Sequence, residues 1–322
     1  MKILIKVIRI FLLIVLIVGI FLMLCFINHS IRILRENKKI RQIGNSVKVV
    51  EKYMNVYTEG SGSQTLVFMS GGGTCSPVLD FRSLYSLLSD KYKIAVVEKF
   101  GYGFSDVVNK KRDIDSILED TRKALIEAEI EAPYILCPHS MSGLEALYWA
   151  QKYPNEVTAI VGLDMAVPEY YDNMKINIPL MRLASFASGA GVTRFIPNIS
   201  ESDAIKHGIL TDEEKELYRM VFYRRTATVT MINEARYVKG NAEVVKNGGV
   251  PQMPILLFIS DGSGGTGFEK DEWRRIPKKY VSQIDGGKYI ELDCPHYVHD
   301  YEYERISGEI SEFLSSFDAQ DE

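Results

Sequence analysis

The stretch that most constrains the fold is 134–147, where a short apolar run and a helical pattern flank a serine. The run 134–137 ends at Pro138, and the helical pattern begins near Met141. This layout predicts a strand, a sharp turn and a helix, with the Ser140 hydroxyl at the apex. A turn this tight brings backbone atoms together and favours small flanking residues. It also places the hydroxyl at a helix N-terminus, where free N–H groups stabilise developing negative charge.

The residues around Ser140 carry a family resemblance. The segment Pro138-His139-Ser140-Met141-Ser142-Gly143 resembles the nucleophile elbow of the α/β-hydrolase family, G-x-S-x-G, with Pro138 and Ser142 in place of the glycines. The alternative is that Ser140 merely caps the following helix. The rest of the chain has to separate these two interpretations.

Length and composition set broad limits. The chain has 322 residues, of which 46% are hydrophobic and 25% charged. These values fit one large globular domain with an added lobe, or two small domains. The net charge of −4 gives no reason to expect nucleic-acid binding.

An apolar segment near the N-terminus predicts a membrane anchor. Residues 10–27 are almost continuously apolar and follow a short basic segment, 1–9. At a rise of about 1.5 Å per residue, such a helix just spans a hydrocarbon core of about 30 Å. A cleaved signal peptide is the alternative, but no A-x-A-like site follows the run. We therefore expect an uncleaved single-pass anchor, followed by a basic juxtamembrane helix or linker over 28–46.

The four cysteines predict neither a disulfide framework nor a metal site. Cys25 lies in the predicted anchor, which leaves Cys75, Cys137 and Cys294 in the soluble part, and no C-x-x-C spacing occurs. An odd number of soluble cysteines without metal-ligand spacing implies no such site. We expect no cofactor and no metal.

Beyond the anchor, apolar runs alternate with helical patterns. Short continuous runs, typical of parallel strands covered on both faces, occur at 65–69, 94–97, 134–137, 159–163 and 255–259. Helical patterns occur at 77–89, 114–128 and 141–152. This alternation predicts an α/β protein with a mostly parallel sheet flanked by helices, and 48–57 is expected to add antiparallel edge strands.

Residues 168–250 interrupt this alternation. They contain no strong strand pattern, and 200–203 and 211–214 both resemble capping boxes. An inserted helical lobe at this point resembles the cap of an α/β hydrolase. The resulting domain prediction is a core formed by 47–167 and 251–317, a helical cap over 168–250, and a tail over 318–322.

The family resemblance implies a catalytic triad in the order serine, acid, histidine. His296 follows the predicted last strand, 289–292, and matches the position of the family's base, whereas His299 is expected to pack against the next helix. Asp261 follows the apolar run 255–259 and matches the position of the orienting acid. Asp164 is the alternative, because some family members take the acid from the preceding strand end.

Two further segments resemble parts of the same family. The loop Ser70-Gly71-Gly72-Gly73 matches the H-G-x loop, with Ser70 where histidine is usual, so that the N–H groups of Gly72 and Met141 would form the oxyanion hole. Residues 98–105 resemble D-x-x-G-x-G-x-S, with Glu98 in place of the aspartate, and are expected to be structural.

Together these matches imply a membrane-anchored serine hydrolase that cleaves a carboxylic ester through an acyl-enzyme. An amidase or aminopeptidase of the same fold is the enzymatic alternative, and a non-catalytic binding module is the alternative of another class. The expected partners are a small-molecule ester or amide and the membrane, with no nucleic acid.

The flanking charges of the anchor lead to a prediction about topology. Basic residues on both sides nearly balance, but a short basic N-terminal segment before an apolar run resembles an export signal. We therefore expect the protein in the cell membrane with its folded domain extracytoplasmic. Protease added to intact cells should degrade that domain, and a domain that survives until the membrane is broken would be cytoplasmic.

Overall fold

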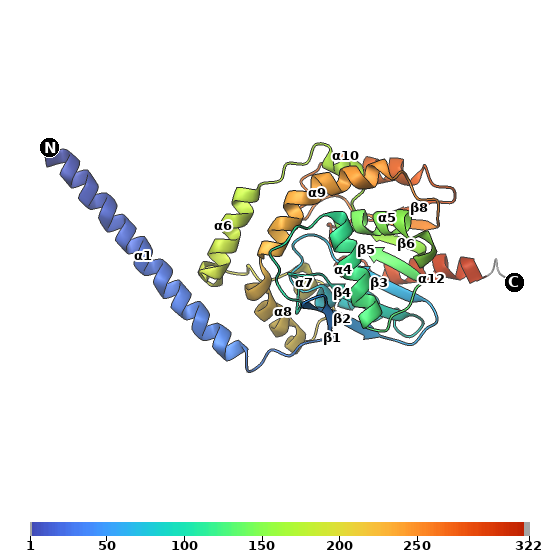
Figure 1. The fold of residues 1–322 in the computed structure, drawn as a ribbon, viewed down its shortest axis with the longest axis horizontal. Coiled ribbons are helices and arrows are strands. Elements are labelled where there is room, and N and C mark those ends of the chain that lie inside the picture. The colour runs from blue at the N-terminus through green and yellow to red at the C-terminus, as the bar shows by residue number, and fades with distance from the viewer. Residues whose placement is uncertain (1, 319–322) are drawn as a thin grey trace.

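The computed structural model describes residues 2–318, which form a twisted sheet covered by helices on both faces and one projecting N-terminal helix (Figure 1). The sheet has the order β1-β2-β4-β3-β5-β6-β7-β8. Its strands are β1 (Asn45–Val49), β2 (Lys52–Glu59), β3 (Thr65–Met69), β4 (Lys93–Glu98), β5 (Tyr134–Pro138), β6 (Val157–Leu163), β7 (Ile255–Ile259) and β8 (Lys288–Glu291).

The sheet is mostly parallel, as its continuously apolar strands predict. β1 and β2 form an antiparallel hairpin, and β2 joins β4 antiparallel, whereas the pairs from β4 to β8 are parallel. Neighbouring residues of β3 face opposite layers of the core, with Val67 in one buried cluster and Phe68 in the other. Burial on both faces is the reason why these strands read as unbroken apolar runs.

Helices from separate parts of the chain cover the two faces. One face packs against α4 (Ile114–Glu127), α5 (Ser142–Lys152) and α10 (Lys270–Val281). The other packs against α2 (Pro77–Asp80), α3 (Arg82–Tyr85) and α12 (Tyr303–Asp318), with α11 (Val298–Tyr301) beside them. The single helix expected over 77–89 is therefore two short ones. Most of the tail expected over 318–322 lies outside the described residues.

Between β6 and β7 the chain is helical. This segment contains η2 (Pro168–Tyr171), α6 (Ile178–Gly189), η3 (Val192–Phe195), α7 (Asp203–Lys206), α8 (Asp212–Arg225) and α9 (Val229–Asn247). Thr211 and Glu214 form the expected capping box of α8. The box expected at 200–203 is wrong, because Ser202 is the N-cap of α7. We refer to 168–250 as the cap, and its division from the core stays a prediction.

The N-terminal helix α1 (Lys2–Glu36) runs without a break from the expected anchor into the expected juxtamembrane segment. By length and composition it is able to cross a membrane, although a signal sequence fits the same criteria. Its apolar side chains are almost all exposed, in contrast to those of a core helix. Figure 1 shows α1 projecting from the rest of the chain and meeting it near the C-terminal end of the helix.

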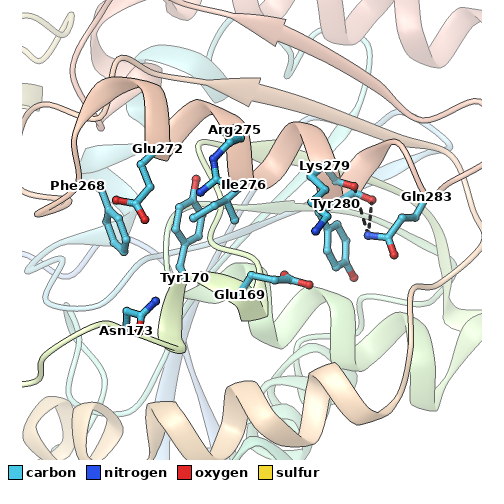
Figure 2. Close-up of a pocket in the computed structure, with 10 residues that line it drawn as sticks. All are labelled: Glu169, Tyr170, Asn173, Phe268, Glu272, Arg275, Ile276, Lys279, Tyr280 and Gln283. Atoms are coloured by element: carbon cyan, nitrogen blue, oxygen red, sulfur yellow. Dashed lines mark hydrogen bonds between the residues drawn. The ribbon is translucent and has the colours of Figure 1, made fainter.

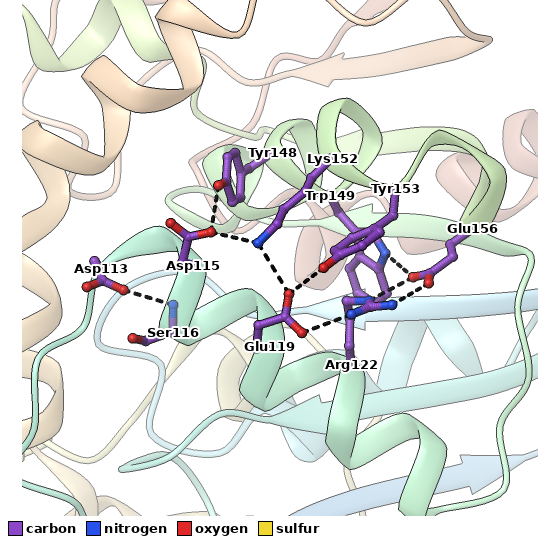
Figure 3. Close-up of polar contacts among 10 residues, drawn as sticks. All are labelled: Asp113, Asp115, Ser116, Glu119, Arg122, Tyr148, Trp149, Lys152, Tyr153 and Glu156. Carbon is purple, nitrogen blue, oxygen red and sulfur yellow. Dashed lines mark hydrogen bonds and ion pairs between the residues drawn. The ribbon is translucent and has the colours of Figure 1, made fainter.

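A surface network joins α4 to α5 (Figure 3). The Arg122 guanidinium donates to both carboxylate oxygens of Glu156, at 2.9 and 2.5 Å, and lies 3.7 Å from the centre of the Tyr153 ring. Glu156 also accepts a hydrogen bond of 2.8 Å from the Trp149 indole. This bidentate pair joins α4 to η1 (Pro154–Glu156), which directly follows α5, through a planar fork that lysine could not supply, and Trp149 connects it to α5.

Buried carboxyl groups lie where α2 meets the cap. Asp80 is buried and accepts a hydrogen bond of 2.8 Å from the Tyr218 hydroxyl on α8. Asp300 is also buried, and neither of its carboxylate oxygens has a hydrogen-bond partner among the described residues. Burial raises the pKa of Asp80 to about 7 and raises the pKa of Asp300 well above its usual range.

These shifts predict that substituting Asp80 changes the pH dependence of stability. An acid with a higher pKa in the folded chain than in the unfolded chain destabilises the fold increasingly between the two values. The destabilisation thus grows as the pH rises from about 4 to about 7. Asp80→Asn keeps an acceptor for Tyr218 without this charge, so its melting temperature should exceed that of the native chain more at pH 8 than at pH 5.

The matched control is Asp90→Asn, since Asp90 is exposed. It should leave the pH dependence of the melting temperature unchanged. An equal effect of Asp80→Asn at both pH values would contradict the predicted ionisation.

Candidate active site

Ser140 stands at the apex of a strained turn between β5 and α5. Its φ is +53°, in the left-handed region that non-glycine residues seldom occupy, as a nucleophile elbow requires. The turn is fixed from both sides, because the Ala166 N–H donates to the Ser140 carbonyl at 2.7 Å and the His139 N–H donates to the Met69 carbonyl at 2.9 Å. Ser140 is half-buried.

The two departures from the elbow pattern have structural explanations. Ser142, in place of the second glycine, is buried, and its hydroxyl lies within hydrogen-bond distance of the Met69 carbonyl, at 2.6 Å, and of the His139 carbonyl, at 2.8 Å. It therefore helps to hold the turn against the end of β3. Pro138 ends β5, so its missing N–H falls at the edge of the turn. Gly143 is the glycine that this turn requires, because a Cβ there would lie 2.1 Å from the Ala166 carbonyl oxygen.

His296 is held by a carboxylate behind it. Its Nδ1 lies 2.6 Å from Oδ2 of Asp164, and both residues are buried. With a carboxylate acceptor at Nδ1, that nitrogen carries the proton and Nε2 is left as the basic nitrogen. His296 lies beside the elbow, because its ring centre is 4.6 Å from that of His139, the residue before Ser140.

The prediction that Asp261 orients His296 is wrong, because Asp164 occupies that position. Asp261 instead accepts a hydrogen bond of 2.8 Å from the Ser263 N–H, which is a turn within its own loop. The loop does return to the histidine, but through its backbone, since the His296 N–H donates to the Ser263 carbonyl at 3.0 Å.

Two residues that sequence reasoning missed hold Asp164. Its Oδ1 accepts from the Ser260 N–H at 2.7 Å and from the Trp273 indole at 2.9 Å, and its Oδ2 accepts from the Ser260 hydroxyl at 2.6 Å. Ser260 directly follows β7, next to Asp261, so that alternation along the strand directs the serine towards Asp164 and the aspartate away. In the sequence, the signal was a serine directly after one strand, at 260, and an acid directly after the neighbouring strand, at 164.

His139 and His299 pack around the base without taking its place. The His139 Nε2 donates to the His296 carbonyl at 3.2 Å, and the ring centres of His139 and His299 are 4.7 Å apart. Burial lowers the pKa of His139 well below its ordinary value and lowers the pKa of His299 to about 3. Both rings are therefore neutral and place no positive charge beside His296.

The glycine loop after β3 lies against the elbow. A Cβ on Gly71 would lie 2.7 Å from the Ser140 Cβ, and one on Gly72 would lie 3.0 Å from the Met141 Cε. Only glycine allows the backbone so close to the serine. Among residues 2–318, the N–H groups of Gly72 and Met141 have no protein acceptor, so both remain available to a ligand.

A buried polar network lies behind this loop. The Lys99 ammonium is 2.5 Å from Glu145 of α5 and 3.0 Å from Glu234 of α9, and all three are almost fully buried. The Tyr102 hydroxyl donates to Glu234 and accepts from the Gly73 N–H at 3.4 Å. The network therefore connects the glycine loop, the elbow helix and the cap, and removing one of its charges would leave others buried without a partner.

A pocket of about 280 Å³ lies between η2 and α10 (Figure 2). Tyr170 lines it and stacks on Trp273 with ring centres 4.3 Å apart, and the edge of Trp273 faces His296 at 5.4 Å. Neither Ser140 nor His296 lines this pocket. The pocket is therefore separate from Ser140 and His296, although Tyr170 and Trp273 connect it to the His296 ring.

Comparisons with known proteins place the chain among its relatives. The chain is 36% identical over 90% of its length to the Uncharacterized protein YbdG of Bacillus subtilis (strain 168), 91% of which is covered. It is also 29% identical, over 38% of its length and 42% of the relative, to 2-(acetamidomethylene)succinate hydrolase of Mesorhizobium japonicum (strain LMG 29417 / CECT 9101 / MAFF 303099). No family model matches the chain.

Similar solved structures include two enzymes of known type. The epoxide hydrolase VrEH1 from Vigna radiata superposes with a TM-score of 0.65 at 18% identity, covering 87% of this chain and 99% of its own. The enol-lactonase from Burkholderia xenovorans LB400 gives 0.62 at 16% identity, covering 84% and 100%. The chain has the α/β-hydrolase fold, and it belongs to one family with YbdG. One distant relative over part of the chain is a hydrolase.

The contacts of the two aspartates predict that substitution by asparagine has a large effect on turnover at Asp164 and almost none at Asp261. Asp164→Asn would set an amide against the donors that surround the carboxylate and favour the wrong tautomer of His296, so hydrolytic turnover should fall by about 10⁴-fold. Asp261→Asn keeps the turn to Ser263 and should change turnover by less than about threefold. Steady-state kinetics, with thermal melting as a check on folding, separates the two. A silent Asp164→Asn with an inactive Asp261→Asn would restore Asp261 as the acid.

Proposed function

We propose that the protein is a membrane-anchored serine hydrolase that cleaves a carboxylic ester through an acyl-enzyme. The observation that carries this proposal is the buried hydrogen bond between His296 and Asp164 beside a serine held at positive φ. A binding module would not need a strained hydroxyl next to a histidine with a fixed tautomer.

In the first half of the proposed reaction, Ser140 becomes acylated. Nε2 of His296 takes the hydroxyl proton while the serine oxygen attacks the ester carbonyl carbon. Asp164 stabilises the imidazolium that results. When the tetrahedral intermediate collapses, His296 returns the proton to the departing alcohol, and the acyl group stays on Ser140.

Water completes the cycle by the same route. His296 takes a proton from water as its oxygen attacks the acyl carbon, and then returns the proton to the Ser140 oxygen as the carboxylic acid leaves. In both halves the negative oxygen is stabilised by two backbone N–H groups, those of Gly72 and Met141. Their position is supported by the close approach of the glycine loop to the elbow and by their lack of other acceptors within residues 2–318.

Two lines of support concern the substrate and the membrane. The enol-lactonase among the similar structures is named for a lactone, which is a cyclic ester, and this agrees with ester cleavage here. Exposed apolar side chains along most of α1 support the anchor, since they would otherwise face water. An extracytoplasmic domain remains part of the proposal.

A fluorophosphonate probe tests the chemistry, because it labels only an activated serine. The native chain should be labelled stoichiometrically, and labelling should be lost in Ser140→Ala and strongly reduced in His296→Ala. Ser315→Ala is the matched control, since Ser315 is exposed on α12 and its hydroxyl contacts only its own helix. An unlabelled native chain would favour a binding module.

Unlabelled native enzyme should then be assayed with p-nitrophenyl esters of graded chain length and with aminoacyl anilides. We expect the esters to be cleaved at a higher kcat/KM. Faster cleavage of the anilides would identify an amidase on the same triad.

A further inference from the structure

Helix α6 of the cap has an unusual distribution of side chains. Its only buried residue is Ser188. Leu180, Leu183 and Phe186 recur at three-residue spacing, which places them along one side of the helix, and each is about 60% exposed. An amphipathic helix of a soluble protein buries such residues and exposes polar ones, whereas α6 leaves these apolar residues exposed.

The apolar surface continues into the next element. Phe195, at the end of η3, is 58% exposed, and Ile196 after it is 47% exposed. We refer to Leu180, Leu183, Phe186, Phe195 and Ile196 as the apolar cap face. Several exposed apolar side chains on two elements in contact, α6 and η3, indicate a surface that is covered in the working protein.

The apolar cap face adjoins the place where α1 is fixed to the cap. The Arg194 guanidinium in η3 donates to both carboxylate oxygens of Glu36, at 2.7 and 3.0 Å, and to His29 Nδ1, at 2.9 Å. Gly191 lies so close to α1 that a Cβ would be 2.4 Å from the His29 Cβ, and Cys25 is buried. Figure 1 shows α6 between α1 and the rest of the cap.

This joint lies at one end of the apolar part of α1. The continuous apolar run of the helix is 10–27, and the residues at the joint are Cys25, His29 and Glu36. If α1 spans a bilayer, the hydrocarbon core must therefore end level with the joint. The apolar cap face then meets the membrane surface rather than open solvent.

We propose that the apolar cap face is inserted into the interface of the bilayer that α1 crosses, so that the cap receives lipophilic esters from the membrane. This inference rests on the proposed anchor and esterase activity. The occupant is lipid because the exposed side chains are aliphatic and aromatic, and because the face continues from the apolar segment of α1. Arg182 is the charged residue of α6, and it is exposed, with a stem long enough to reach headgroups.

Tryptophan fluorescence in liposomes tests the insertion. The native tryptophans, Trp149 and Trp273, are buried and supply a constant background. Full-length Leu183→Trp should lose about half of its added emission when brominated phospholipid replaces ordinary phospholipid. Ile126→Trp is the matched control, because Ile126 is 64% exposed on α4, a helix of the core, and its emission should change little.

Equal quenching of the two variants would overturn the inference. So would a blue-shifted Leu183→Trp emission that brominated lipid does not quench, because a second copy or another protein would then cover the face. Neither result depends on catalysis, so the fluorescence decides the inference even if the esterase proposal fails.

An activity comparison tests the delivery of substrate. The double variant Leu183→Glu with Phe186→Glu should lose at least about tenfold in rate on a long-chain ester dissolved in vesicles and keep its rate on a soluble short-chain p-nitrophenyl ester. Ile126→Glu should leave both rates unchanged. Equal losses of the double variant on both esters would show a structural role for α6, and no loss on either would show that the face does not serve delivery. Absence of native activity on both esters would refute the esterase proposal instead.

Discussion

The carboxylate of Asp164 is the interaction on which the arrangement of the site depends. Its two oxygens are shared among Ser260, Trp273 and His296, which belong to three separate segments after β6. A buried carboxylate with so many donors has one stable orientation, and its hydrogen bond to His296 fixes the orientation of the imidazole as well. The orientation of His296 therefore depends on groups at the ends of adjacent parallel strands and on Trp273 of α10.

A second buried set of charges joins the glycine loop after β3, the helix α5 and the helix α9 of the cap. Lys99 contacts one carboxylate on α5 and one on α9, and Tyr102 reaches the glycine loop. Because these groups are shielded from water, a displacement of the cap would separate charges at a high free-energy cost. The cap is thus tied most firmly near the elbow, while α6, at its outer edge, buries almost nothing.

Most of the fold could be predicted from the sequence, because five strands are buried on both faces and leave unbroken apolar runs. The elbow and the histidine loop were also predictable, since local turns and the positions after strands define them. The acid was not, because Asp164 and Asp261 both follow apolar strands, and only the direction of the side chains beyond β7 separates them. The joint between His29 and Arg194 was equally hidden, because it links distant segments that carry no shared pattern.

The core and the helix α1 are both joined to the cap. The cap is held to the core by buried groups such as Tyr218 on Asp80, and to α1 by Arg194 on Glu36. A rigid connection at both ends means that the orientation of α1 determines the orientation of the catalytic core. An anchor joined only by a flexible linker would leave the domain free to rotate. Here the charged joint would hold the cap towards the bilayer, and a substrate leaving the membrane would meet the cap first.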